Sequence, residues 1–167
     1  CLPRLTELIL GGNKMHTLTE GQFNEARFPS LRALESPGQR QLTRIEKNAF
    51  AIRGLNSLNL NYNPQLKFRD DDSVSGESLS GCPNLTSLSL IDTDFRGVRE
   101  ERFKRLFGHL TNLTDLFLRS TMISHVTSGM FISLTSLRVL DLSDNKLFYL
   151  PQAVFHPLPS LTRHNLS

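Results

Sequence analysis

The chain has 167 residues with a formal net charge of +3, and 38% of its residues are hydrophobic. That length suffices for one cooperative unit with an apolar core, and no apolar run reaches the roughly 20 residues that a membrane-spanning helix needs. Side chains of both signs alternate, as between Arg96 and Arg105. The composition therefore disfavours a nucleic-acid interface built on a basic stripe.

A leucine frame recurs along the chain at intervals of 24 to 30 residues. Its clearest copy runs from Leu137 to Leu147 and reads LxxLxL followed by Ser, Asp and Asn. The first leucines of the copies are Leu5, Leu31, Leu55, Leu85, Leu113, Leu137 and Leu161. A self-similar unit of this length is typical of a leucine-rich-repeat solenoid, in which each unit buries its apolar face against the next. We predict a single domain over residues 1–167, with about six full repeats and a partial one.

Each repeat is expected to contribute one short strand to a parallel sheet on the concave face of a horseshoe, an α/β repeat solenoid. The second and third leucines of the frame are two residues apart, so they point to the same face of a strand, into the core. The ninth position closes the strand and is occupied by Asn13, Asn63, Thr93, Thr121 and Asn145. An amide there can satisfy both kinds of backbone group in a buried turn.

Two further positions are expected to fill the core opposite the sheet. One carries Phe23, Phe50, Phe103, Phe131 and Phe155, with Leu79 in the third repeat. The other carries Leu2, Phe28, Ile52, Cys82, Leu110, Leu134 and Leu158. Core packing is the expected role of all of them, because a single repeat cannot bury its own apolar face.

The second repeat departs from the frame, because Ser36 replaces an inward leucine and Pro37 follows it. Proline lacks an N–H group for the ladder, so we expect a bulge or interrupted pairing over Ser36–Gln39. The last repeat departs too, with His164 in place of the second leucine; there we expect an exposed end and not a ligand.

The third repeat is the longest, and its extra length lies in Pro64–Gly81. This segment is either a plain lateral loop or a contact loop beside the sheet. It contains Asp70, Asp71 and Asp72, but the alternating spacing of a calcium loop is missing, so no metal site is predicted. In the fourth repeat, apolar residues at helical spacing predict a short amphipathic helix over Arg99–Leu110.

Cys1 and Cys82 are about three repeats apart, which places their Cα atoms on the order of 14 Å apart. A disulfide needs less than about 7 Å, so Cys82 is predicted to be a buried free thiol. Asn84, Asn112 and Asn165 begin N-x-S/T triplets, the glycan acceptors of secreted proteins. Such triplets also arise by chance, and Asn165 differs in falling on an outward strand position.

The pattern LxxLxLxxNxLxxLxxxxFxxLxx, clearest in Leu113–Ser160, resembles the typical class of leucine-rich repeat found in animal extracellular proteins. With its irregular repeat lengths and no caps at its two truncated ends, the chain most resembles an internal piece of a Toll-like receptor ectodomain. That resemblance implies an extracellular module that binds a protein or microbial ligand on its concave face or lateral loops and signals by dimerisation. Contact with a membrane is expected only through segments outside this chain.

The outward strand positions give candidate ligand-binding residues. Phe117 is expected to be exposed and ringed by Asp115, Arg119, Arg138 and Asp141, and aromatic and arginine side chains dominate protein interfaces. Tyr62 and Asp92 are secondary candidates. The alternative is that these residues hold solvent and form exposed ion pairs such as Asp115–Arg138, which contribute little.

No arrangement of residues indicates an enzyme. None of the five histidines lies in a nucleophile motif or at a metal-ligand spacing, so neither catalysis nor a cofactor is predicted. Three non-catalytic roles remain: a receptor ectodomain, an adhesion or matrix protein that binds other proteins, and an intracellular scaffold. Glycan occupancy at Asn84 and Asn112 would separate the first two from the third.

Overall fold

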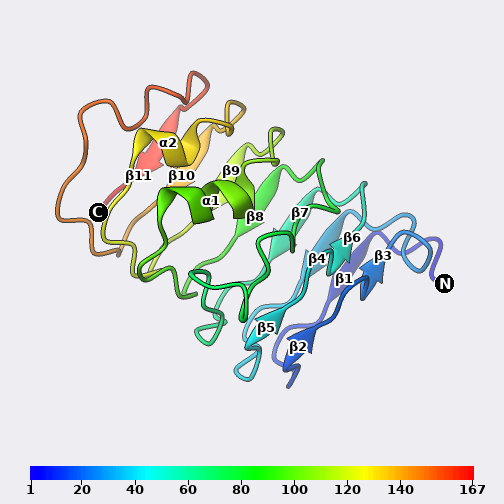
Figure 1. Ribbon diagram of the computed structural model, residues 1–167. Helices are drawn as coiled ribbons and strands as arrows, with labels where there is room; N and C mark the ends of the chain where they lie inside the picture. The colour runs from blue at the N-terminus through cyan, green and yellow to red at the C-terminus, as the bar shows by residue number, and fades with distance from the viewer.

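The computed structural model describes residues 1–167 as a stack of similar turns (Figure 1). One side of the stack is a seven-stranded sheet in the order β1-β4-β7-β8-β9-β10-β11, with every pair parallel. The predicted solenoid with a parallel sheet is therefore confirmed. Its strands are β1 (Glu7–Ile9), β4 (Ala33–Glu35), β7 (Ser57–Asn59), β8 (Ser87–Ser89), β9 (Asp115–Phe117), β10 (Val139–Asp141) and β11 (Arg163–Asn165).

The register follows directly from the leucine frame. The middle residue of the first six strands of this sheet is the second leucine of its repeat, and it pairs with the equivalent residue of the next turn, as Leu88 does with Leu116 and Leu116 with Leu140. The same pairing places His164 opposite Leu140 in the last strand, where His164 is exposed as expected. Equivalent positions of successive turns consequently form straight rows across the sheet.

The opposite side of the stack changes character along the chain. The first turns carry two small parallel sheets, formed by β2 (Thr17–Leu18) with β5 (Arg44–Ile45) and by β3 (Phe23–Asn24) with β6 (Phe50–Ala51). Later turns carry helices α1 (Glu100–Phe107) and α2 (Ser128–Phe131), in front of the sheet in Figure 1. No helix has the length and apolar character needed to cross a bilayer.

Helix α1 confirms the amphipathic segment predicted from the sequence. It buries Phe103, Leu106 and Phe107. Its first turn is acidic and its last turn basic, which complements the helix dipole. Glu100 accepts hydrogen bonds from Lys104 Nζ, at 2.7 Å, and from Thr127 Oγ1 of the next turn, and these bonds lower its pKa.

The core is one ribbon of buried apolar side chains that runs the length of the stack. Behind the leucines, aromatic rings form a chain in which Phe68 stacks on Phe95 at 4.3 Å and Phe103 meets Phe131 edge-on at 5.6 Å. The expected core role of Leu2 is wrong, because this residue is 53% exposed on the first turn. Only one neighbouring turn packs against that side of the core.

The expected interruption over Ser36–Gln39 is also wrong. Ser36 N–H donates to the Asn59 carbonyl at 2.8 Å and Gly38 N–H donates to the Asn61 carbonyl at 2.9 Å, so pairing continues past the proline. In the other turns the N–H of the seventh position does not enter the backbone ladder; that of Ile91, for example, donates to the Asn61 side chain. Pro37 occupies this seventh position, where the ladder needs no donor.

The ninth position ties neighbouring turns together, and it includes Gln39, which sequence reasoning missed. Gln39 Nε2 donates to the Leu10 carbonyl at 2.5 Å, and Gln39 N–H donates to Asn63 Oδ1 at 2.9 Å. Asn63 in turn donates from Nδ2 to the carbonyls of Leu60 and Ser36, at 2.7 and 3.1 Å. These bonds satisfy buried backbone groups on two turns at once.

Candidate binding surface

The concave face consists of the side chains on either side of each inward leucine. They are Glu7 and Ile9, Ala33 and Glu35, Ser57 and Asn59, Ser87 and Ser89, Asp115 and Phe117, Val139 and Asp141, and Arg163 and Asn165. Small polar residues occupy the middle strands, and the one aromatic side chain of the face lies on β9. None of these residues is needed to fill the core, so this face is available for contact with another molecule.

The structure brings the predicted Phe117 group together but in a different arrangement. Phe117 is half-buried and not fully exposed, because the register sets Ser89 and Asp141 on either side of it, within side-chain contact range. The Asp115–Arg138 ion pair, which the alternative interpretation of this face named, does not form. The ion pair that forms in this group joins Arg119 Nε to Asp144 Oδ2 at 2.7 Å. The exposed Arg138 guanidinium has no carboxylate partner.

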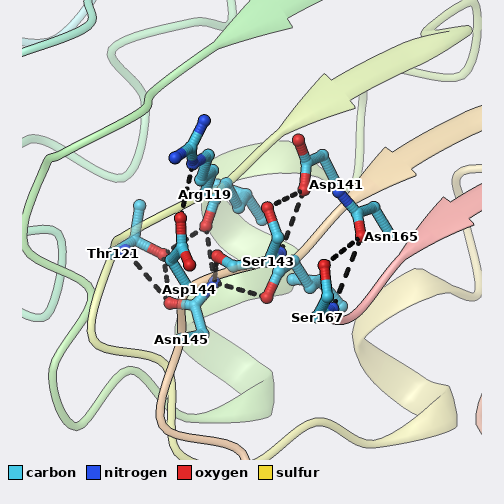
Figure 2. Close-up of polar contacts among 10 residues, drawn as sticks. Arg119, Thr121, Asp141, Ser143, Asp144, Asn145, Asn165 and Ser167 are labelled. Carbon is cyan, nitrogen blue, oxygen red and sulfur yellow. Dashed lines mark hydrogen bonds and ion pairs between the residues drawn. The ribbon is translucent and has the colours of Figure 1, made fainter.

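Hydrogen bonds fix the polar side chains of this group (Figure 2). Asp141 Oδ1 accepts from the Ser143 N–H at 2.9 Å and from its hydroxyl at 2.6 Å. The hydrogen bond to Asp144 raises the pKa of the Arg119 guanidinium, and the charge of Asp141 adds to the effect. Asp141 and Arg119 therefore place charged groups beside the Phe117 ring, and each of these groups already has a hydrogen-bond partner within the chain.

Tyr62 and Asp92 lie away from the strands, at the eighth position of their turns. That position is left-handed in six turns, with φ of 73° at Gly12, 67° at Gly38, 59° at Tyr62, 56° at Asp92, 56° at Ser120 and 54° at Asp144. The reversal turns the chain out of the strand, and it projects Tyr62, 55% exposed, over the rim of the sheet. Tyr62 and Asp92 share one surface hollow there with Lys14 and Arg40.

The insertion Pro64–Gly81 extends the layer of β5 and does not lie beside the sheet. Val74 forms a parallel bridge with Ile45 of β5. Arg102 of α1 is only 11% exposed; its Nε donates to the Phe68 carbonyl at 2.8 Å, and its guanidinium also binds the carbonyls of Asp70 and Val74. The insertion is thereby anchored to the helix of the following turn.

The aspartates of this insertion serve the same anchor. The Asp71 carboxylate accepts from the Gly76 N–H at 2.8 Å, from Arg102 at 2.7 Å and from Arg105 at 2.8 Å. These hydrogen bonds, led by the one from Gly76, lower the pKa of Asp71. No three histidine, cysteine or acidic side chains are grouped so that they could hold a metal ion.

The predicted glycan acceptors occupy two different surfaces. Asn84 and Asn112 are exposed on adjacent turns at one lateral edge, where Asn112 Nδ2 lies 3.4 Å from Asn84 Oδ1. Asn165 is half-buried on the concave face, and its Oδ1 accepts from the Ser167 hydroxyl at 2.8 Å. Glycosylation at all three stays a prediction.

Both cysteines are free: Cys1 is exposed, and Cys82 is the buried free thiol that was predicted. Burial raises the pKa of the Cys82 thiol to about 12. The Cys82 Sγ–H donates to the Leu79 carbonyl at 3.2 Å, so this side chain behaves as a small core residue.

Residues 83–147 and 111–167 match the family model described as Leucine rich repeat, and together these matches span half of the chain. The chain belongs to the leucine-rich repeat family. Members of this family are typically non-catalytic modules that bind other proteins. No curated protein matches the chain in sequence.

Several solved structures resemble the chain. TLR13 in its complex with ssRNA13 is 29% identical with a TM-score of 0.80, over 98% of this chain and 22% of TLR13. Toll from the Drosophila Toll–Spatzle complex is 19% identical with a TM-score of 0.65, over 99% of this chain and 27% of the other. Internalin C2 of Listeria monocytogenes is 22% identical with a TM-score of 0.68, over 99% and 63%. The chain thus spans about a fifth of TLR13, and the latter two likenesses show the fold alone.

Proposed function

We propose that the chain is a non-catalytic ligand-recognition module of an extracellular innate-immune receptor of the Toll-like type. The observation that carries the proposal is the match to TLR13, which extends over 98% of this chain at 29% identity with a TM-score of 0.80. The irregular turns, with one insertion anchored by Arg102 and one helix-bearing turn, support the same assignment. Signalling by dimerisation belongs to this proposal as the general behaviour of such receptors.

The proposed ligand is a protein or a microbial molecule bound on the concave face. Phe117 and Arg138 offer an aromatic ring and an unpaired guanidinium on neighbouring turns, the two kinds of side chain that dominate interfaces. The Asp141 carboxylate, which Ser143 holds, and the paired Arg119 would set the orientation of the ligand, with the Asp115 carboxylate on the same strand as Phe117. TLR13 was solved with single-stranded RNA, but the alternation of acidic and basic residues on this face disfavours a polyanion.

The second candidate is an adhesion or matrix protein that binds other proteins, a role that a leucine-rich repeat module can also serve. Both candidates place the chain outside the cell, as the two exposed triplets at the lateral edge also suggest. Expression in a secreting mammalian cell tests this location. Enzymatic removal of glycans should lower the mass of the wild-type chain, and the shift should vanish in the Asn84→Gln/Asn112→Gln/Asn165→Gln variant.

Sequencing the transcript on both sides of this segment tests the receptor role. A single membrane-spanning helix followed by a cytoplasmic signalling domain would support the receptor. A lipid-anchor signal or matrix-type modules would overturn it in favour of adhesion. Either result leaves the proposed binding face to be tested by mutation.

A further inference from the structure

We propose that a hollow at the rim of the first turns binds an acidic side chain of a protein partner. This site, here called the glycine hollow, is lined by Gly12, Lys14, Gly38, Arg40, Tyr62 and Asp92, among others. It is separate from the Phe117 group on the concave face. The inference rests on the proposed role in ligand recognition and adds a second contact of defined chemistry.

The hollow exists because two successive turns carry glycine at the left-handed eighth position. A Cβ atom added at Gly12 would meet no atom within 4 Å, and one added at Gly38 would meet only the Gly12 nitrogen at 3.9 Å. The next two turns place Tyr62 and Asp92 at the same position. Side chains therefore stand on one side of the hollow while the backbone forms its floor.

The two cations of the hollow have no carboxylate partner in the chain, and they outnumber the one carboxylate of the lining, Asp92. Lys14 and Arg40 each follow a glycine of the floor by two residues, so they lie on adjacent turns at equivalent positions. Both are exposed, and neither side chain forms an ion pair or a hydrogen bond. By contrast, Lys47 and Arg119 each have a carboxylate partner, at 3.6 and 2.7 Å. Two like charges one turn apart favour an anion between them.

The other groups of the hollow restrict the anion to a modest size and charge. Tyr62 offers an exposed ring and a hydroxyl without a partner, which suits the aliphatic part and one oxygen of a carboxylate side chain. The Asp92 carboxylate is also unpartnered and would repel a polyanion. A nucleic acid would need more than two cations to bind well, whereas one glutamate or aspartate is matched by Lys14 and Arg40. Asp92 would then accept a hydrogen bond from a neighbouring N–H group of the partner.

Fluorescence anisotropy with the full chain tests the proposal. The probe is a fluorescein-labelled peptide of serines with a single central glutamate, and the matched peptide carries glutamine in place of that glutamate. We expect the glutamate peptide to bind in low salt and the glutamine peptide not to bind. Neutralising either cation, as in Lys14→Gln or Arg40→Gln, should weaken binding about tenfold, because each removes one charged contact.

A Gly38→Asn variant fills the hollow without changing its charge. Asparagine tolerates the left-handed conformation, and Asp92 and Asp144 adopt it at equivalent positions. We expect this variant to fold and to lose peptide binding. The matched control is Ser120→Asn, which places asparagine at the eighth position of a distant turn and should bind like the wild type.

Several results would overturn the proposed binding of an acidic side chain at the glycine hollow. They are no binding of the glutamate peptide, equal binding of both peptides, and unchanged affinity in Gly38→Asn. Tighter binding of an oligouridylate than of the peptide would assign the hollow to nucleic acid instead. These failures are distinct from failure of the receptor role, because transcript sequencing can support a receptor whether or not the peptide binds.

Discussion

Replacing Asn63 with alanine should destabilise the chain far more than the same change at Asn13. Both residues occupy the ninth position of a turn. Asn63 is buried, and its side chain serves the Gln39 N–H and the carbonyls of Leu60 and Ser36. Asn13 is exposed and donates only to the Leu10 carbonyl, at 2.7 Å. The comparison therefore changes burial and bond number while it keeps the chemistry constant.

The expected magnitudes follow from the groups left without partners. Three buried backbone groups lose a bond in Asn63→Ala, and each costs about 1–3 kcal/mol, so the free energy of unfolding should fall by about 3–9 kcal/mol. Asn13→Ala removes one bond in contact with water and should cost about 1 kcal/mol or less. Urea unfolding followed by circular dichroism measures both. Equal losses in the two variants would refute the idea that the ninth position satisfies buried groups between turns.

Three further predictions test other parts of the structure. Phe117→Ala should weaken ligand binding and lower the free energy of unfolding by about 1 kcal/mol, whereas Leu116→Ala in the core should lower it by about 2–5 kcal/mol. Similar losses of stability for the two variants in thermal unfolding would show that the strand faces are misassigned. Because the folded-state pKa of Asp71 is lowered, its contribution to stability is present above the ordinary aspartate pKa of 3.8 and is lost as the pH falls through the lowered value. The difference in urea midpoint between wild type and Asp71→Asn should shrink over that acid range, and a constant difference would contradict the assignment. Because the pKa of Cys82 is raised to about 12, iodoacetamide at mildly alkaline pH should modify Cys1 alone until urea unfolds the chain. Mass spectrometry of the peptides would show which cysteine is labelled, and rapid labelling of folded Cys82 would contradict its burial.

The solenoid was predictable because it depends on a repeated spacing that few other folds share. Residues two apart on a strand must point the same way, so the pair Leu116 and Leu118 identifies the inward face without any structure. The error over Ser36–Gln39 arose from a finer point. A proline breaks a ladder only where its missing N–H would have donated, and Pro37 occupies the position between two donors.

The candidate site was less predictable, because side-chain partners depend on geometry that spacing does not specify. Asp115–Arg138 and Arg119–Asp144 both join adjacent turns, and only the structure shows that the second pair forms. The glycine hollow, in contrast, had a signal in the sequence. Gly12 and Gly38 occupy the same position of successive repeats, and a repeated glycine marks a place where side chains are missing and backbone is accessible.

The turn that begins at Leu85 and the turn that begins at Leu113 are joined on both sides of the core. On the back, Phe103 packs on Phe131 at 5.6 Å and Thr127 bonds to Glu100. Beyond the sheet, the N–H groups of Asp92 and Phe95 donate to the carbonyls of Arg119 and Thr121, at 3.0 and 2.9 Å. This junction should therefore resist bending in both directions. The distance between Tyr62 and Phe117 is then set by the stack, so a partner that contacts both side chains has to match that span.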